Sequence, residues 1–268
     1  MQQIAGRVAV VTGAGSGIGR AVSLELVRRG AAVALVDVDE PRLTEVRRAV
    51  EHRGGRCSTH VVDVASGPRM AALPEEVLDE HGSVHILVNN AGVSVNLPFD
   101  QQSPEDLGWI TGINYWGVVH GCRHFLPHLK RADEAHIVNV SSSAGLTGMK
   151  GQSSYSATKF AVRGLSESLY VELAGTGVGV TCVHPGAVAT NILQAARMDP
   201  ERRARMLPMF TYAMPPGTAA RRIVQAVETG RFKLVVGADA RSIDLMKRVA
   251  PIGTLKLLRA AARRGARR

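Results

Sequence analysis

A glycine-rich turn near the N-terminus joins an apolar run to an amphipathic one. Residues 7–12 read RVAVVT, residues 12–19 read TGAGSGIG and residues 19–30 read GRAVSLELVRRG. The first run is typical of a buried strand, and the last of a helix with one apolar face. Glycines at such a junction allow a tight bend and let phosphate groups approach the backbone at the helix N-terminus. The junction therefore predicts an α/β unit that binds a nucleotide.

The alternation of apolar runs and helical segments continues along the chain. Runs rich in valine and isoleucine lie at residues 7–12, 32–37, 56–64, 84–92, 135–142, 179–186 and 233–237. They are nearly continuous, which is typical of parallel strands covered on both faces. We expect an α/β fold with a doubly wound, Rossmann-type parallel sheet of about seven strands and helices on both faces.

No linker rich in Pro, Gly or Ser divides the chain, so a single domain is expected over residues 1–240. Its cofactor half would cover about 1–140 and its catalytic and substrate half about 141–240. Residues 241–268 form a basic, amphipathic tail, which Pro251 is expected to split into two short helices.

Positive charge is concentrated in this tail. The formal net charge is +10, but residues 253–268 hold six basic residues and no acid, which leaves +4 for the other 252 residues. A charge confined to a tail does not predict a nucleic-acid-binding fold. Peripheral contact with an anionic membrane surface is one expectation for the tail, and a plain packed helix is the alternative.

The cysteines and the N-terminal residues indicate in which cellular compartment the protein is expected. The three cysteines are widely spaced and form no CxxC pattern, which favours a reducing environment over a disulfide framework. No targeting segment and no run of about 20 apolar residues is visible. We therefore expect a cytoplasmic protein. His120, His124 and His128 have helical spacing, but they lack an acidic or cysteine partner, so no metal site is expected.

Asp37 ends the second expected strand, 18 residues after Gly19. A carboxylate there can accept hydrogen bonds from an adenosine ribose, and it repels a 2′-phosphate. Ser16 and Val38 bring no cation beside it, and Arg20 is the one nearby base. The pattern favours NAD as cofactor over NADP, with helix capping as the alternative role of the aspartate.

Tyr155 and Lys159 stand four residues apart in an expected helix, so their side chains share one face. An ammonium group near a phenol favours the phenolate, and we expect Lys159 to lower the pKa of Tyr155. Such a pair suits proton exchange with a hydroxyl or carbonyl group. Alone, however, the Tyr-x-x-x-Lys pattern is common.

Several further motifs accompany this pair, and together they closely resemble the short-chain dehydrogenase/reductase family over about residues 5–190. They are TGAGSGIG (12–19), NNAG (89–92), Asn114 in INYWG, VNVSSSAG (138–145), YSATK (155–159) and HPGAVAT (184–190). The resemblance implies a single-domain oxidoreductase that transfers a hydride between NAD(P) and an alcohol or ketone.

The resemblance also implies roles for individual residues. Tyr155 would be the acid–base, Lys159 would bind the nicotinamide ribose, Ser142 would hold the substrate oxygen and Asn114 would kink its helix and hold a water molecule. Ser141 and Ser143 rival Ser142 by type, and only the spacing selects Ser142. The implied cofactor-binding residues are Gly13, Ser16, Gly17, Ile18, Gly19, Asp37, Asp63, Val64, Asn90, Ala91, Gly92, Tyr155, Lys159, Pro185, Gly186, Val188 and Thr190.

Two features of the resemblance concern neighbouring residues. In the NNAG segment, Asn89 would lie nearest the adenosine ribose. His184 departs from the asparagine that often precedes Pro-Gly in the family, and its side chain could face the substrate.

Residues 191–214 hold four of the eight methionines and resemble a substrate-binding lid. Flexible methionines suit a bulky apolar substrate, although simple packing onto the core is an equal alternative. Leu97, Phe99, Leu146 and Met149 are candidates for the opposite wall. We therefore expect an NAD-dependent dehydrogenase for an apolar, possibly lipid- or steroid-like, secondary alcohol.

The alternatives are an NADP-dependent carbonyl reductase and, from another class, a non-catalytic nucleotide-sensing scaffold. The resemblance also implies a homodimer or homotetramer built on long helices near residues 105–130 and 152–173.

Overall fold

In the computed structural model, which describes residues 1, 3–210 and 213–265, seven strands form one parallel sheet in the order β3-β2-β1-β4-β5-β6-β7. The strands are β1 (Val8–Thr12), β2 (Ala32–Asp37), β3 (Cys57–Val61), β4 (Ile86–Asn89), β5 (Ala135–Val140), β6 (Val178–Pro185) and β7 (Lys233–Val236). The order reverses between β1 and β4, and ligands of open α/β sheets bind at such a switch point. The expected doubly wound parallel sheet is confirmed.

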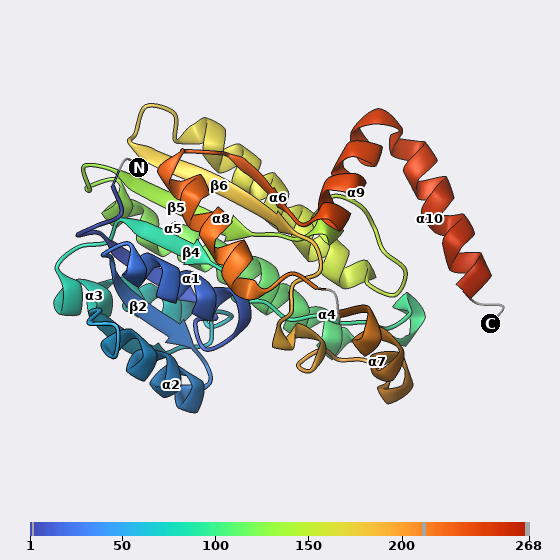
Figure 1. Cartoon of the computed structure of the whole chain (residues 1–268), viewed down its shortest axis with the longest axis horizontal. Helices are drawn as coiled ribbons and strands as arrows, with labels where there is room; N and C mark the ends of the chain where they lie inside the picture. Colours follow the sequence, from blue (N-terminus) through green and yellow to red (C-terminus); the bar gives the residue numbers. More distant parts are fainter. Residues whose placement is uncertain (2, 211–212, 266–268) are drawn as a thin grey trace.

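Helices cover both faces of the sheet (Figure 1). One face carries α1 (Gly17–Arg28), α2 (Glu40–Glu51) and α8 (Pro216–Glu228), and the other carries α3 (Gly67–His81), α5 (Gly117–Leu129) and α6 (Ser153–Glu172). Within β1, Ala9 and Val11 join the first core while Val8 and Val10 join the second. Successive side chains of a strand point to opposite faces, so burial of both faces explains the unbroken apolar runs.

The segments that follow β4, β5 and β6 cover the carboxyl edge of the sheet. They carry α4 (Pro104–Thr111), a π-helical turn (Gly112–Trp116), α7 (Pro200–Met206) and the short 3₁₀ turns Phe99–Gln101, Ser143–Gly145, Asn191–Leu193 and Leu207–Phe210. In Figure 1, α4 and α7 both appear at this end of the molecule.

The C-terminal segment consists of α9 (Ala238–Val249) and α10 (Pro251–Gly265), and Pro251 separates the two helices as expected. The expected limit of the domain at residue 240 falls inside α9. Among the described residues, no helix is both long and apolar enough to cross a membrane.

Candidate active site

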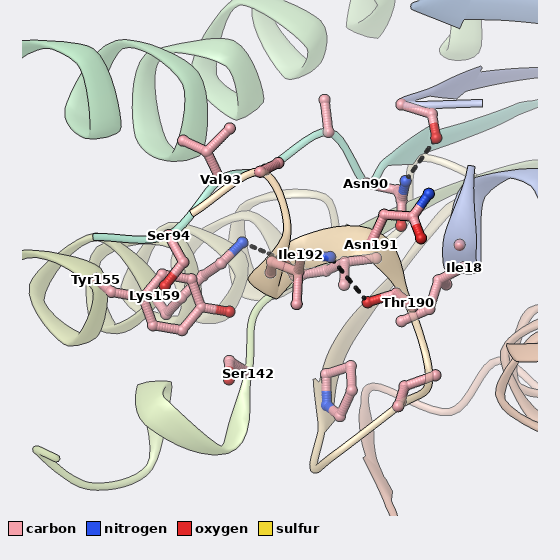
Figure 2. Close-up of a pocket in the computed structure, with 18 of the residues that line it drawn as sticks. Ile18, Asn90, Val93, Ser94, Ser142, Tyr155, Lys159, Thr190, Asn191 and Ile192 are labelled. Carbon is pink, nitrogen blue, oxygen red and sulfur yellow. Dashed lines mark hydrogen bonds between the residues drawn. The ribbon is translucent and has the colours of Figure 1, made fainter. Parts of the chain in front are cut away.

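A cavity of about 510 Å³ opens at the carboxyl edge of the sheet. Figure 2 shows Tyr155, Lys159 and Ser142 toward one end, and Ile18, Asn90 and Thr190 toward the other. The expected site residues that line it are Gly13, Ser16, Gly17, Ile18, Asp37, Asp63, Val64, Asn90, Ala91, Gly92, Ser142, Tyr155, Lys159, Pro185, Gly186, Val188 and Thr190. Two expected residues, Gly19 and Asn114, are not part of this lining.

The glycine-rich turn is too crowded for side chains. A Cβ atom at Gly19 would lie 2.1 Å from the carbonyl oxygen of Gly13, and one at Gly13 would lie 2.9 Å from the Cα atom of Ala91. At Gly17, where α1 begins, a Cβ atom would lie 3.0 Å from Thr190. The bare backbone leaves the N-terminus of α1 open toward the cavity, which is the arrangement that binds phosphate groups. The residues present therefore fit a dinucleotide.

Asp37 borders the same cavity at the end of β2. Its Oδ2 atom accepts a hydrogen bond from the Gly15 amide at 2.9 Å, and its Oδ1 atom accepts one from the Asp39 amide at 3.2 Å. The backbone thus holds the carboxylate at the rim of the cavity, where it can still accept bonds from a ribose.

The nearby cation differs from the expected one. Arg20 borders a separate cavity on another side of α1, whereas Arg42 lines the main cavity near Asp37. The guanidinium of Arg42 pairs with Asp39, with 3.1 Å between Nε and Oδ2. Arg42 lies in the first turn of α2, and it comes to lie near Asp37 because of the direction in which α2 leaves β2.

The two asparagines of NNAG have different surroundings. Asn90 lines the cavity, its backbone amide donates to Thr12 Oγ1 at 3.0 Å, and its side chain donates to the Thr12 carbonyl at 2.9 Å. These bonds tie the loop after β4 to the end of β1. Asn89 is buried behind the loop and donates to Asn139 Oδ1 at 2.8 Å. The expectation that Asn89 faces the adenosine ribose is therefore wrong, because its side chain points into the core.

Asn114 sits in the π-helical turn between α4 and α5 and is fully buried. Its Oδ1 atom accepts from the Val93 amide at 2.8 Å, and its Nδ2 atom donates to the Val93 carbonyl at 2.9 Å. A Cβ atom at Gly92 would lie 3.3 Å from both Asn114 Oδ1 and Lys159 Nζ. Glycine at this position therefore allows the asparagine and the lysine to approach the same stretch of backbone.

Lys159 is 3% exposed, and its ammonium donates to the Val140 carbonyl at 3.0 Å. Burial lowers the pKa of this lysine to about 8. The Nζ atom lies 5.8 Å from the centroid of the Tyr155 ring, so it approaches the ring and also bonds the end of β5.

Burial raises the pKa of the Tyr155 phenol, and the neighbouring Ser142 hydroxyl acts in the opposite direction. The expected lowering of this pKa by Lys159 is not found in the free protein. Desolvation of the phenol dominates there, and the ammonium of Lys159 bonds the Val140 carbonyl. The phenol is therefore protonated in the free enzyme at neutral pH.

The three candidate serines have different bonds. Ser141 Oγ donates to the Lys159 carbonyl at 2.8 Å. Ser142 Oγ accepts from the Ala144 amide at 3.1 Å, which leaves its own proton free for another acceptor. Figure 2 shows Ser142 next to Tyr155.

His184 does not face the substrate end, because it is 1% exposed and lies under Ser142, whose carbonyl is 3.2 Å from Nδ1. Burial lowers the pKa of this histidine to about 4, so it is neutral. Its role here is to support the loop after β5.

The substrate end of the cavity is mainly apolar. Met206, Ile192 and Leu193 come from the expected lid, and Met149 comes from the opposite wall. Phe99 is instead 68% exposed and is not a lining residue. Within residues 191–214, residues 211–212 lie outside the described structure, as do the side chains of residues 209 and 210.

Arg197 fastens residues 191–214, the expected lid, to the loop after β4. Its backbone amide donates to the Ser94 carbonyl at 3.0 Å, and its carbonyl accepts from the Asn96 amide at 2.9 Å. Its guanidinium lies 4.1 Å from the Trp109 ring centroid and bonds Asp106 at 2.8 Å. These contacts hold this segment beside the loop after β4 and α4.

A set of hydrogen-bonded polar residues lies beside this apolar wall, and the sequence did not predict it. Gln152 donates to the fully buried Asn96 at 2.6 Å, and Asn96 donates to Ser94 at 2.8 Å. Ser94 and Gln152 both line the cavity, so they can meet a polar atom of the substrate. Ile243 of α9 also lines it. Only the position of Gln152 three residues before Tyr155 hinted at this in the sequence.

Among the described residues, no group of three His, Cys, Asp or Glu side chains could hold a metal ion. His120, one of the three histidines with helical spacing, has its Nδ1 atom 3.1 Å from the Val64 carbonyl.

The fold and cavity define a dinucleotide-dependent α/β oxidoreductase, and comparisons with known proteins give the family. A profile of the family described as short chain dehydrogenase matches residues 7–201. The Mycobacterium tuberculosis protein named "Putative oxidoreductase SadH" is 39% identical over 255 residues, which cover 93% of this chain and 92% of that protein.

Two solved structures that resemble this chain hold a bound nicotinamide cofactor. A short chain dehydrogenase/reductase from Burkholderia phymatum in complex with NAD has a TM-score of 0.88 at 31% identity, covering 92% of this chain and 95% of that one. A 3-ketoacyl-(acyl-carrier-protein) reductase from Brucella melitensis complexed with NADH has a TM-score of 0.77 at 27% identity, covering 87% and 98%.

This chain belongs to the short-chain dehydrogenase/reductase family. It is an oxidoreductase that acts on CH–OH groups with NAD(P).

The buried ammonium predicts a pH-dependent stability. The pKa of Lys159 falls from 10.5 to about 8 on folding, so between these values the unfolded chain binds more protons than the native protein. The free energy of unfolding should therefore rise with pH in this range. Relative to Lys159→Met, the wild type should gain about 2 kcal/mol between pH 7.5 and 9.5, measured by urea unfolding without cofactor. Lys130→Met, which removes an exposed ammonium, is the control; parallel curves for wild type and Lys159→Met would refute the argument.

Proposed function

We propose that this protein interconverts an apolar secondary alcohol and its ketone with NAD, and that Tyr155 is the general acid–base. One observation carries the proposal: the phenol of Tyr155 and the hydroxyl of Ser142 border the substrate end of a cavity whose other end carries the glycine turn and Asp37.

The proposed chemistry uses few side chains. A bound nicotinamide supplies the hydride acceptor or donor. During reduction, Ser142 donates a hydrogen bond to the carbonyl oxygen, and Tyr155 gives that oxygen a proton. During oxidation, the ionised phenol of Tyr155 accepts the hydroxyl proton. Because burial favours the neutral phenol, the free enzyme is poised as the acid for reduction.

The lining of the substrate end suits an apolar substrate that carries one polar atom besides the reacting oxygen. Met149, Ile192 and Met206 offer apolar contacts, while Ser94 and Gln152 offer hydrogen bonds beside them. The mycobacterial relative is named as an oxidoreductase and the Brucella protein as a reductase, which agrees with this class of reaction.

Two alternatives remain to be tested. An NADP-dependent carbonyl reductase is favoured by Arg42, which lines the cavity near Asp37 and could pair with a 2′-phosphate. A nucleotide-sensing scaffold would bind cofactor without turnover. The joint presence of Asn114, Ser142, Tyr155 and Lys159 argues against the scaffold.

Tyr155→Phe should lower kcat by about 1000-fold, because the proton donor and acceptor is lost. Assays would use a panel of steroid and aliphatic secondary alcohols with NAD⁺, followed by absorbance of the reduced cofactor. NADH binding, measured by fluorescence, should be nearly unchanged. Oxidation by the wild type should also rise with pH as the phenol ionises.

Tyr170→Phe, at a half-exposed tyrosine outside the cavity, is the matched control and should keep full activity. If Tyr155→Phe turned over alcohols as fast as the wild type, the acid–base role would be wrong. NADH binding without turnover across the panel would favour the scaffold.

Asp37→Ser should shift cofactor preference toward NADP by at least about tenfold in kcat/KM, because the repulsion of a 2′-phosphate is removed while Arg42 stays in place. Asp63→Asn is the control, since Asp63 lines the adenosine end and its loss should weaken both cofactors alike. A wild type that prefers NADPH, or a ratio unchanged in Asp37→Ser, would contradict NAD specificity.

We also propose a homodimer or homotetramer that uses α5 and α6. Apolar side chains lie exposed on or next to these helices, among them Trp116 at 49%, Phe160 at 41% and Val171 at 72% exposure. Phe160→Arg should lower the mass measured by light scattering, while Phe99→Arg, at an exposed phenylalanine elsewhere, should not. Equal masses for the two variants and the wild type would contradict this interface.

A further inference from the structure

The helix α10 extends away from the body of the protein (Figure 1). It packs mainly on α9, and its buried side chain Thr254 bonds the Ala250 carbonyl at 2.9 Å, which fixes the bend between the two helices. Much of the surface of α10 is therefore left without a partner among the residues that the structure describes.

Exposed apolar and basic side chains share one face of α10. Ile252, Leu255, Lys256, Arg259 and Arg263 follow helical spacing and are all exposed, Ile252 at 63% and Leu255 at 41%. A face of this composition suits the boundary between lipid headgroups and acyl chains, where apolar side chains insert and cations meet anionic headgroups.

The exposed face of α9 repeats the pattern. Leu245 is 63% exposed and Val249 is 76% exposed, and Arg241 and Arg248 lie beside them. No acidic residue follows Asp244 in the sequence, and Asp244 is paired with Lys233. Beyond Asp244, every charged side chain of the α9–α10 segment is therefore basic, and Asp239 at the start of α9 faces the cavity and the Ala187 amide.

We propose that the α9–α10 segment docks this enzyme on an anionic lipid surface. The positive charge of α10 favours an anionic membrane over a second copy of the chain as the partner of this segment. A symmetric contact through α10 would bring two basic faces together with no carboxylate between them, which is unfavourable. A surface of anionic lipids instead complements the basic side chains of α10 and of the exposed face of α9.

The segment is also connected to the cavity. Asp239 and Ile243, on α9, line the cavity, and Asp239 accepts a hydrogen bond from the Ala187 amide at 2.8 Å. Docking through α9–α10 would therefore bring the cavity close to the lipid surface. This last step rests on the proposed function, because an apolar alcohol dissolved in the membrane would then reach the site without crossing water.

The test measures binding of the full-length protein to phosphatidylcholine vesicles with and without phosphatidylglycerol. Wild type should bind the anionic vesicles at low salt and dissociate at high salt. Lys256→Gln/Arg259→Gln/Arg263→Gln should weaken this binding by roughly 10- to 100-fold, and Ile252→Ser/Leu255→Ser should also weaken it. Arg48→Gln/Lys130→Gln/Arg131→Gln, with the same charge loss at exposed positions elsewhere, should bind like the wild type.

Other outcomes would overturn the proposal. The wild type could fail to bind anionic vesicles, or the control triple variant could lose as much vesicle binding as the α10 triple variant. Ile252→Ser/Leu255→Ser could change the oligomer mass and leave vesicle binding unchanged. The protein could also bind duplex DNA and not the vesicles.

Activity separates this proposal from the proposed function. The α10 variants should keep wild-type kcat and KM with a water-soluble alcohol, and lose activity only toward a long-chain alcohol presented in anionic vesicles. Loss with the soluble alcohol would contradict docking as their role. A wild type inactive with both substrates would refute the proposed function while the vesicle-binding result still stood.

Discussion

The buried ammonium of Lys159 is the constraint around which the active end of the cavity is arranged. Burial of a cation costs several kcal/mol unless polar groups surround it. Here the Val140 carbonyl accepts one hydrogen bond, and Gly92 keeps the neighbouring loop bare beside Nζ. The Ser141 hydroxyl bonds the lysine's own carbonyl and so ties α6 to the end of β5. The lysine thus helps to set the relative positions of β5, α6 and the loop after β4, on which the placement of the Tyr155 and Ser142 hydroxyls depends.

The same burial sets the protonation states of Tyr155 and Lys159 in the free protein. In the free protein, burial holds the phenol of Tyr155 neutral and weakens the ammonium form of Lys159. Both effects oppose proton abstraction from an alcohol. The glycine turn and Asp37 hold the other end of the cavity with backbone hydrogen bonds, so the site is preformed where the nucleotide would bind.

The C-terminal segment lines the cavity with part of α9 and is otherwise exposed at the surface. Asp239 supports the backbone after Pro185 and Gly186, and Ile243 adds to the apolar wall. On the opposite side, Arg197 fastens the lid to the loop after β4. The substrate end is therefore closed by segments distant in the sequence, and the exposed helix α10 continues directly from one of them.

The sequence by itself determined the parallel sheet, the glycine turn and the Tyr155–Lys159 pair, because strand burial, tight turns and helical spacing are local patterns. The tertiary structure decided what depends on neighbours distant in the chain. Asn89 points into the core because Asn139 of the adjacent strand bonds it, and Arg42, in place of Arg20, stands by Asp37 because of the direction in which α2 leaves β2. The direction of the Tyr155 pKa shift was likewise beyond the sequence, since desolvation depends on everything packed around a group, and spacing reports only its neighbours along one helix.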